Sequence, residues 1–365
     1  MNPAGVQPYC NPITSLPVDT SIPIPLKSLK DRTLVITGGA SGIGASIAVK
    51  VAENGGNVII GDVNTTLGQE LVAYIRRTTK SDNHHCLHLD VTLWQSQVSF
   101  FAEAVSLSPH GGLDCIIANA GIANLTEQKA FEEPIHPSLL DTTKAPPYRT
   151  FSVNALGVLY TTDIALSYLK HNPGSSKCEL TASDGPRDRH LLLVSSIAGV
   201  AAVPTQSIYA AAKHAVVGLF RALRVTAPIT AGVRVNMINP YFTDTPILGP
   251  EGPLVMAGAA MARIDDVTNA AVRLIADRSI VGRALLIGSR ATKAEVEAAG
   301  VDWVENDQYG NAVRDIMGDD WKQTDVFVRR LIGVTNLVSA GKGWVGLVAD
   351  IIAFFVHGMF KLMGR

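Results

Sequence analysis

Residues 33–62 read TLVITGGASGIGASIAVKVAENGGNVIIGD. A β-branched run opens this stretch, a glycine-rich turn and a segment with helical spacing follow, and a second β-branched run ends it. A strand, a tight turn, a helix and a second strand in this order are typical of a βαβ unit, whose two strands lie parallel in one sheet. The stretch therefore predicts an α/β fold.

The same alternation continues toward the C-terminus. Further strand candidates are HCLHLDV, LDCIIANAG, HLLLVSS, GVRVNMINP and ALLIGS, most of them separated by helical stretches. We therefore expect residues 29–289 to form one doubly wound Rossmann domain with a seven-stranded parallel sheet. A polar insert, residues 123–150, follows the carboxyl end of a strand, where open α/β sheets bind ligands. We expect this insert and residues 196–207 and 245–262 to build a pocket for a small molecule.

The two ends of the chain fall outside this domain. Residues 1–28 are rich in proline and lack the pattern of a signal peptide, so we expect an extended or disordered arm. Residues 290–365 have a mostly helical pattern and end in the hydrophobic tail 344–360. Three interpretations of the tail stay open: a helix on a membrane surface, a helix packed on its own or a partner subunit, and a short membrane span. Asp350 and His357 would be costly inside a bilayer.

The composition excludes several classes of protein. Of 365 residues, 47% are hydrophobic and 17% charged, which allows a large core and rules out wholesale disorder. The 31 basic and 32 acidic residues nearly cancel, so no net field would attract nucleic acid. The four cysteines form no CxxC pair, which is typical of a reducing compartment. We expect a cytoplasmic protein, peripheral on a membrane if the tail binds one, with no nucleic acid partner and no metal site.

The turn between the first strand and the first helix is a candidate binding site. Its glycines let backbone N–H groups approach a pyrophosphate at the helix N-terminus, where the helix dipole favours an anion. Asp62 ends the next strand, 24 residues after Gly38, where a carboxylate can accept hydrogen bonds from ribose hydroxyls. The same carboxylate would repel a 2′-phosphate, and no Arg or Lys lies beside it to receive one. The pattern therefore favours NAD over NADP.

A second candidate site is YAAAK, residues 209–213, at the start of a helical stretch. Tyr209 and Lys213 share a helix face, where the ammonium group is expected to lower the pKa of the phenol from about 10 toward neutral pH. A phenol tuned in this way can accept or deliver a proton at a carbinol oxygen. Ser196 stands thirteen residues upstream at a strand end and is placed to hold the same oxygen.

Together these residues resemble the short-chain dehydrogenase/reductase family of the compact, NAD(P)-dependent type, over roughly residues 34–289. The resemblance implies a catalytic tetrad of Asn154, Ser196, Tyr209 and Lys213. In such enzymes the tyrosine is the acid/base, the serine orients the substrate oxygen, the lysine also binds the nicotinamide ribose and the asparagine holds a water of the proton relay. The implied cofactor-binding residues are Gly38, Ser41, Gly42, Ile43, Gly44, Asp62, Asp90, Val91, Asn119, Ala120, Gly121, Tyr209, Lys213, Pro240, Phe242 and Thr245. One departure is Tyr241, which follows Pro240 where the family usually has glycine.

Within the family, residues 194–219 most resemble hydroxyprostaglandin- and hydroxysteroid-dehydrogenase-like members, which act on lipophilic secondary alcohols. The resemblance implies an NAD-dependent oxidoreductase of secondary metabolism. It would move a hydride between nicotinamide and the secondary alcohol or ketone of a steroid, terpenoid or polyketide-like molecule. It also implies a homodimer or homotetramer paired through residues 151–170 and 209–227. The alternatives are a non-catalytic NAD-binding sensor and a membrane-tethered scaffold.

Overall fold

The computed structural model describes residues 14–317 apart from 134, 140–142, 181–184, 186, 202, 250–259, 299 and 301. The hydrophobic tail 344–360 and the first part of the predicted arm therefore lie outside the described residues. No helix in the described part of the chain is both long and apolar enough to cross a membrane.

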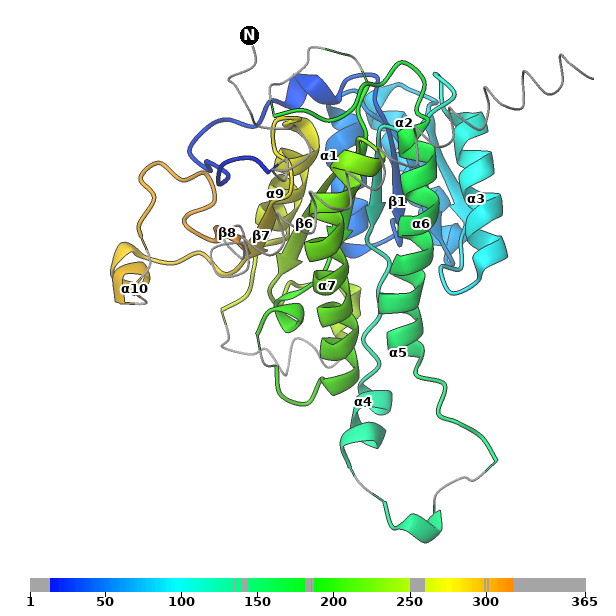
Figure 1. Cartoon of the computed structure of the whole chain (residues 1–365), viewed down its shortest axis with the longest axis vertical. Coiled ribbons are helices and arrows are strands. Elements are labelled where there is room, and N and C mark those ends of the chain that lie inside the picture. The colour runs from blue at the N-terminus through cyan, green and yellow to red at the C-terminus, as the bar shows by residue number, and fades with distance from the viewer. Residues whose placement is uncertain are drawn as a thin grey trace, which may run out of the picture. The chain divides into compact units, whose positions relative to one another are not determined.

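One sheet of eight strands crosses the described part of the chain, in the order β3-β2-β1-β4-β5-β6-β7-β8 (Figure 1). Its strands are β1 (Thr33–Thr37), β2 (Asn57–Asp62), β3 (His84–His88), β4 (Cys115–Ala118), β5 (His190–Val194), β6 (Arg234–Pro240), β7 (Ala284–Ile287) and β8 (Val313–Ile316). All neighbours from β3 to β7 pair in parallel, and β8 pairs antiparallel with β7. The predicted doubly wound α/β fold is confirmed, with one strand more than the seven expected.

The additional strand, β8, lies within residues 290–365, for which the sequence predicts helix. It has only four residues, two of them charged, so its sequence carries no strand pattern of its own. Contacts with distant parts of the chain hold it in place. Asp315 forms an ion pair with Arg283 at 2.6 Å, and its carboxylate accepts a hydrogen bond from the backbone N–H of Val18 at 2.9 Å.

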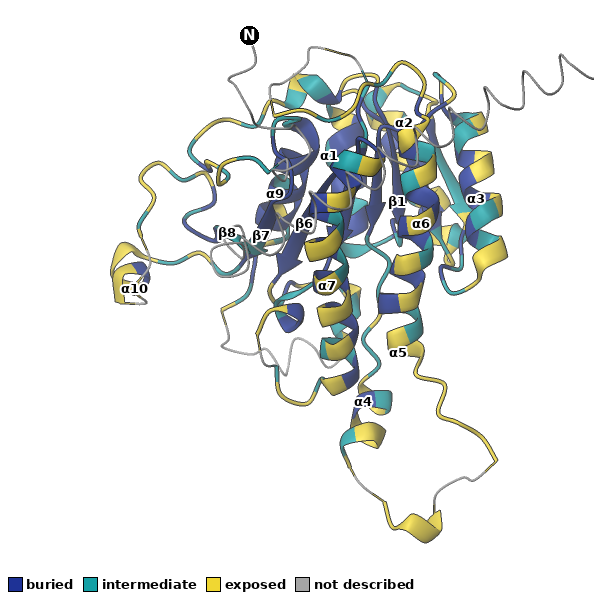
Figure 2. Cartoon of the chain, viewed as in Figure 1, coloured by how far each residue is buried: buried dark blue, intermediate teal, exposed yellow. Residues whose placement is uncertain are grey.

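Helices cover both faces of the sheet. On one face lie α1 (Gly42–Glu53), α2 (Thr65–Thr79) and α9 (Ile264–Ala276), and on the other lie α3 (Trp94–Leu107), α6 (Gly157–Lys170) and α7 (Ser207–Thr230). The strands alternate between the two cores: Leu34 and Ile36 of β1 belong to one and Val35 to the other. Figure 2 shows the strands buried between helices whose outer sides are exposed.

Shorter elements connect these layers. They are α4 (Leu125–Glu132), α5 (Arg149–Phe151), a π-helical turn (Ser152–Leu156), α10 (Lys293–Ala298) and the 3-10 helices Leu26–Leu29, Pro137–Leu139, Ile197–Gly199 and Pro246–Leu248. Because α5, the π-helical turn and α6 follow one another without a break, residues 149–170 form one continuous helix.

The direction of winding reverses at β1. From β1 the chain adds β2 and β3 on one side, and β4 then pairs with β1 on the other side. In open α/β sheets such a reversal leaves a crevice outside the carboxyl ends of the two central strands. The glycine turn after β1 and Asn119 after β4 therefore lie at this crevice.

Candidate active site

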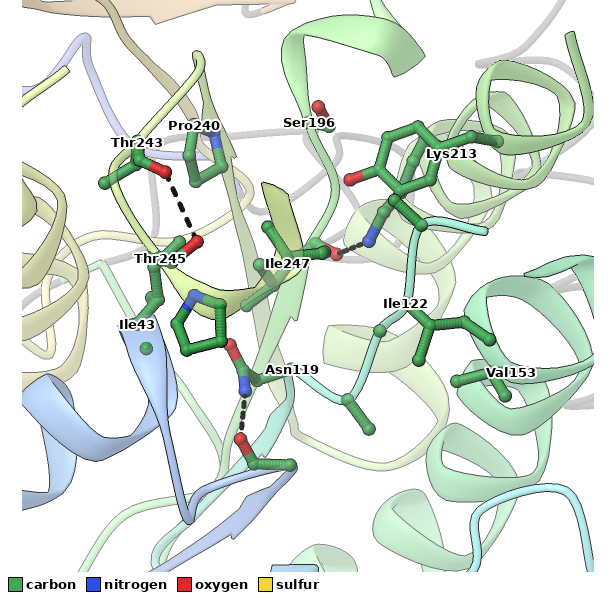
Figure 3. A pocket seen from close by; sticks show the side chains of 18 of the residues that line it. Ile43, Asn119, Ile122, Val153, Ser196, Lys213, Pro240, Thr243, Thr245 and Ile247 are labelled. Carbon is green, nitrogen blue, oxygen red and sulfur yellow. Dashed lines mark hydrogen bonds between the residues drawn. The ribbon is translucent and has the colours of Figure 1, made fainter. Parts of the chain in front are cut away.

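A cavity of about 510 Å³ lies at the carboxyl ends of the strands. The predicted residues that line it are Gly38, Ser41, Gly42, Ile43, Asp62, Asp90, Val91, Asn119, Ala120, Gly121, Ser196, Tyr209, Lys213, Pro240, Phe242 and Thr245. Figure 3 shows Ser196 and Lys213 together, across the cavity from Thr245. Two predicted residues, Gly44 and Asn154, are not among the residues that line the cavity.

The glycine turn after β1 is compact because several of its glycines have no room for a side chain. Gly38 has a φ of +64°, and a Cβ there would lie 2.7 Å from the Cα of Ala120. Gly42, which begins α1, also has a positive φ, +54°. A Cβ at Gly44 would lie 2.6 Å from Nδ2 of Asn119, so Gly44 allows α1 to pack closely instead of lining the cavity.

Asn119 and Ser41 set the polar character of this turn. Nδ2 of Asn119 donates a hydrogen bond to the carbonyl oxygen of Gly38 at 2.9 Å, drawn in Figure 3, and another to that of Thr37 at 3.0 Å. Ser41 is the N-cap of α1 and makes no side-chain capping hydrogen bond. The first N–H groups of α1 are thus left for an anion, which is the arrangement that holds a pyrophosphate.

Asp62 lines the cavity from the end of β2. Its carboxylate accepts hydrogen bonds from the backbone N–H groups of Ala40 at 3.0 Å and Asn64 at 2.9 Å. These bonds fix the carboxylate beside the glycine turn and leave lone pairs on both oxygens for hydroxyl donors. Among the described residues that line the cavity, Lys213 is the one Lys or Arg.

Tyr209 and Lys213 reach the cavity from the first two turns of α7. The Nζ of Lys213 donates a hydrogen bond to the carbonyl oxygen of Val194 at 3.1 Å and lies 5.6 Å from the centre of the Tyr209 ring. Burial lowers the pKa of Lys213 to about 8. Burial also raises the pKa of Tyr209, and a hydrogen bond with Ser196 opposes this rise. The expected lowering of the Tyr209 pKa is therefore wrong, because burial of the phenol is the larger effect.

Asn154 lies behind the cavity wall, in the π-helical turn. It is fully buried, and its side chain forms two hydrogen bonds with the backbone of Ile122: Oδ1 accepts from the N–H and Nδ2 donates to the carbonyl, both at 2.8 Å. A Cβ built on Gly121 would lie 3.3 Å from Oδ1 of Asn154 and 3.6 Å from Nζ of Lys213. Asn154 and Lys213 thus both approach Gly121, in the segment that follows β4.

Several residues that line the cavity are not part of any motif. The apolar ones include Ile122, Val153, Ile197, Val203, Ile247 and Leu248, and Gln206 and Tyr241 add polar atoms. Tyr241 fits without strain, since its N–H donates to the carbonyl of Ile287 at 2.8 Å and its ring packs edge-on against Phe242. Among the described residues of the insert 123–150, only Ala123 lines the cavity. Ile197, Val203, Gln206, Ile247 and Leu248 belong to the segments 196–207 and 245–262 that were expected to build the pocket. Ile122 and Val153 were missed, and their position next to Gly121 and Asn154 is the signal that could have found them.

Comparisons with known proteins agree with this geometry. A family model described as short chain dehydrogenase matches residues 32–253. The 5′-hydroxyaverantin dehydrogenase of Dothistroma septosporum is 33% identical over 281 residues, which is 74% of this chain and 88% of that protein. An NADP-dependent dehydrogenase of a Phoma species is 30% identical over 267 residues, which is 70% of this chain and 74% of that protein.

A solved structure shares the fold. It is described as 3-ketoacyl-(acyl-carrier-protein) reductase from Brucella melitensis complexed with NADH. It has a TM-score of 0.56 and 24% identity, over 71% of this chain and 97% of that one. The sheet, the glycine turn and the cavity define an α/β protein built to bind a dinucleotide. The chain belongs to the short chain dehydrogenase family.

Proposed function

We propose that the protein is an NAD-dependent dehydrogenase that interconverts a secondary alcohol and a ketone on a lipophilic small molecule. The observation that carries this proposal is the meeting of Ser196, Tyr209 and Lys213 in the same cavity as the glycine turn. The name of the Dothistroma relative, a dehydrogenase of 5′-hydroxyaverantin, supports an alcohol substrate.

The residues of the cavity fit a nicotinamide dinucleotide. Gly38, Ser41 and Gly42 would hold the pyrophosphate against the first turn of α1. Asp90 and Val91 would contact the adenine, and Pro240, Phe242 and Thr245 would flank the nicotinamide. When bound, the nicotinamide supplies the hydride acceptor or donor.

The preference for NAD is proposed from charge. Asp62 presents lone pairs where ribose hydroxyls are expected, and its negative charge repels a 2′-phosphate. The described cavity wall offers one cationic side chain, Lys213, and it lies at the Tyr209 end. The NADP-dependent Phoma relative makes this preference a question for experiment.

Tyr209 is proposed as the acid/base. During oxidation its phenolate oxygen takes the hydroxyl proton of the substrate while the hydride leaves the same carbinol, and during reduction the phenol returns a proton to the developing alkoxide. Ser196 orients the substrate oxygen through its hydroxyl. Lys213 brings a positive charge close to the phenol at the moment its oxygen becomes negative. Because burial raises the pKa of Tyr209, the rate of oxidation, which needs the phenolate, is expected to increase as the pH is raised above neutral.

The first test is Tyr209→Phe. The variant is expected to lose at least about 100-fold in turnover, the scale of general acid/base catalysis, while it still binds NADH. NADH absorbance is followed with testosterone, borneol and aryl carbinols, and NADH fluorescence reports binding. The control is Tyr74→Phe, because Tyr74 is exposed on α2. Unchanged turnover in Tyr209→Phe would refute the role, and wild-type protein that binds NADH but oxidises nothing would favour the sensor.

The second test is Asp62→Ser. Loss of hydrogen bonds to a charged acceptor is expected to weaken NAD binding by roughly 1.5–3 kcal/mol and to relieve the repulsion of NADP. Titration of both cofactors against wild type and variant measures the change. Equal affinities of the wild type for NAD and NADP would contradict the assignment.

A further inference from the structure

Helix α4 meets the amino-terminal ends of the two helices that carry Asn154, Tyr209 and Lys213. Figure 1 shows α4 beside the ends of α5 and α7. Three side chains of α4, those of Glu127, Gln128 and Glu132, accept hydrogen bonds from backbone N–H groups of these ends. None of the three lines the cavity, so none touches a bound substrate there.

The first turn of α7 depends on α4 for its capping. Gln206, the N-cap residue of α7, makes no side-chain capping hydrogen bond. Instead Oε1 of Glu132 accepts from the backbone N–H of Ser207 at 2.8 Å and from its hydroxyl at 2.6 Å. Oε1 of Gln128 accepts from the N–H of Ile208 at 2.9 Å. The next residue along the chain is Tyr209, so the capped turn is the one that carries the phenol.

The chemistry of the two capping side chains fits this task. Gln128 is 3% exposed, and its Nε2 has no hydrogen-bond partner among the described residues. Burial of this amide costs free energy, and the hydrogen bond from α7 to its Oε1 offsets only part of that cost. The hydrogen bonds from Ser207 lower the pKa of Glu132 and keep it ionised at neutral pH. A negative charge at the N-terminus of a helix is stabilised by the helix dipole.

The same helix caps the other chain segment of the site. The carboxylate of Glu127 accepts hydrogen bonds from the backbone N–H groups of Arg149 at 2.6 Å and Thr150 at 3.0 Å, at the start of the continuous helix 149–170. Asn154 follows one turn later and binds Ile122, three residues before α4 begins. Helix α4 and the helix 149–170 are therefore joined at two places. Glu127 of α4 binds the start of that helix, and Asn154 of that helix binds Ile122, just before α4.

We propose that Glu127, Gln128 and Glu132 are positioning residues that hold the Tyr209 and Asn154 helices at the distance that proton transfer requires. This role rests on the proposed dehydrogenase function. A misplacement of about 1 Å at reacting groups can cost about 100-fold in rate, so a loosened first turn of α7 acts on kcat. The cofactor-binding turn after β1 is on other elements and is expected to keep its affinity.

The experiment compares matched variants of full-length protein. Glu132→Ala and Gln128→Met remove the acceptors, with Met keeping the length of the buried side chain. Glu132→Gln and Gln128→Glu keep an acceptor oxygen and serve as conservative rescues. Lys129→Ala is the control, because Lys129 lies on the same helix with a side chain 71% exposed. The readouts are kcat and KM with the fastest alcohol of the panel, the deuterium isotope effect, and amide hydrogen exchange of residues 203–213.

Acceptor removal is expected to lower kcat by at least about tenfold, to raise the isotope effect and to speed exchange at Ser207 and Ile208. The KM for NAD is expected to change less than about twofold, and the rescues to restore most of kcat. A kcat for Glu132→Ala equal to that of Lys129→Ala overturns the proposal, as does unchanged exchange. The exchange measurement needs no turnover, so it still decides the matter if no alcohol is oxidised and the proposed function itself fails.

Discussion

Lys213 is the most costly single residue of the site. Its side chain is 3% exposed, and its Nζ donates a hydrogen bond to a carbonyl, that of Val194, and not to a carboxylate. Burial of an ammonium group without a carboxylate partner is unfavourable, which is why the pKa of Lys213 falls from 10.5 to about 8. A buried charge of this kind is typical of a functional site, where the charge acts on the reacting atoms.

Replacing Lys213 by Met is therefore expected to stabilise the protein while it abolishes turnover. The unfolded chain binds more protons than the folded one between about pH 8 and 10.5, so wild-type stability rises with pH through that window. At pH 7 the variant should be more stable by about 1–3 kcal/mol, and the difference should shrink above pH 8. Urea unfolding of both proteins at pH 7 and pH 9.5 measures this. A variant that is less stable at pH 7 would contradict the account of burial.

Individual site residues also show which contacts the sequence could predict and which it could not. The motif spacing predicted which side chains meet at the cavity, because a βαβ unit brings strand ends and helix starts together whatever the sequence between them. It did not specify which way each one faces. Gly44 packs against Asn119, and Asn154 turns toward the backbone of Ile122, because the close approach of two distant segments decides these contacts.

At the scale of elements, an ionic cluster ties together the amino-terminal ends of the strands, at the edge of the sheet opposite the cavity. Asp188 precedes β5, and its buried carboxylate pairs with Arg234 of β6 at 2.6 Å and with Arg32, which precedes β1, at 3.2 Å. Burial raises the pKa of Asp188, but the charges of both arginines and the Arg234 hydrogen bonds outweigh it and hold the pKa well below 3.8. The folded carboxylate therefore stays ionised at a lower pH than the same carboxylate in the unfolded chain.

Asp188→Asn should leave two buried guanidinium groups without a charged partner. We expect a loss of roughly 3–5 kcal/mol in the free energy of unfolding at pH 7, with NADH affinity unchanged in the fraction that is folded. The wild-type contribution is full above about pH 4 and is lost as pH falls below it, because the unfolded carboxylate protonates first. Stability measured from pH 7 to pH 3 should therefore fall less steeply in the variant. Identical pH slopes would show that Asp188 is not the group responsible.

Elements differ in how far sequence alone predicts them. Most strands from β1 to β7 are apolar runs that any parallel sheet would bury, so their pattern sufficed. The exceptions are β3, HHCLH at the edge of the sheet, and β6, RVNMINP, which alternates polar and apolar residues. β8 and α4 have no such pattern: β8 is held by Arg283 and Val18, and α4 by the ends of α5 and α7. Their positions depend on partners more than 20 residues away in the chain, which no local pattern contains.

At the scale of the whole molecule, the exposed faces of α7 and of the continuous helix 149–170 are suited to self-association. Ala211, Ala215 and Ala222 of α7 are exposed, and small side chains allow a second helix to approach closely. Leu156 and Leu159 of the neighbouring helix are 37% and 47% exposed. These faces coincide with the segments 151–170 and 209–227 expected to pair two subunits, so we propose a homodimer or homotetramer formed without the tail.

The tail 344–360 lies outside the described residues, and its sequence sets its own constraints. As a helix of about 1.5 Å per residue, its 17 residues would reach about 26 Å, short of a hydrocarbon core of about 30 Å. Asp350 and His357 would need to stay in water, whereas Trp344, Phe354 and Phe360 suit the headgroup boundary. A helix in the membrane surface satisfies both groups of side chains, and it would place a cavity for lipophilic alcohols near their source.

Deletion of residues 344–365 is therefore expected to abolish flotation with anionic liposomes while it leaves the oligomer and turnover intact. Apolar contact and the basic residues Lys342, Lys361 and Arg365 are the two attractions, so flotation of the full chain should also weaken as salt is raised. Flotation of both proteins, paired with static light scattering, separates the interpretations. Full-length protein that stays in solution without floating would exclude membrane binding, and a deletion that yields monomers would show that the tail is a subunit interface, because the exposed faces of α6 and α7 would then not suffice.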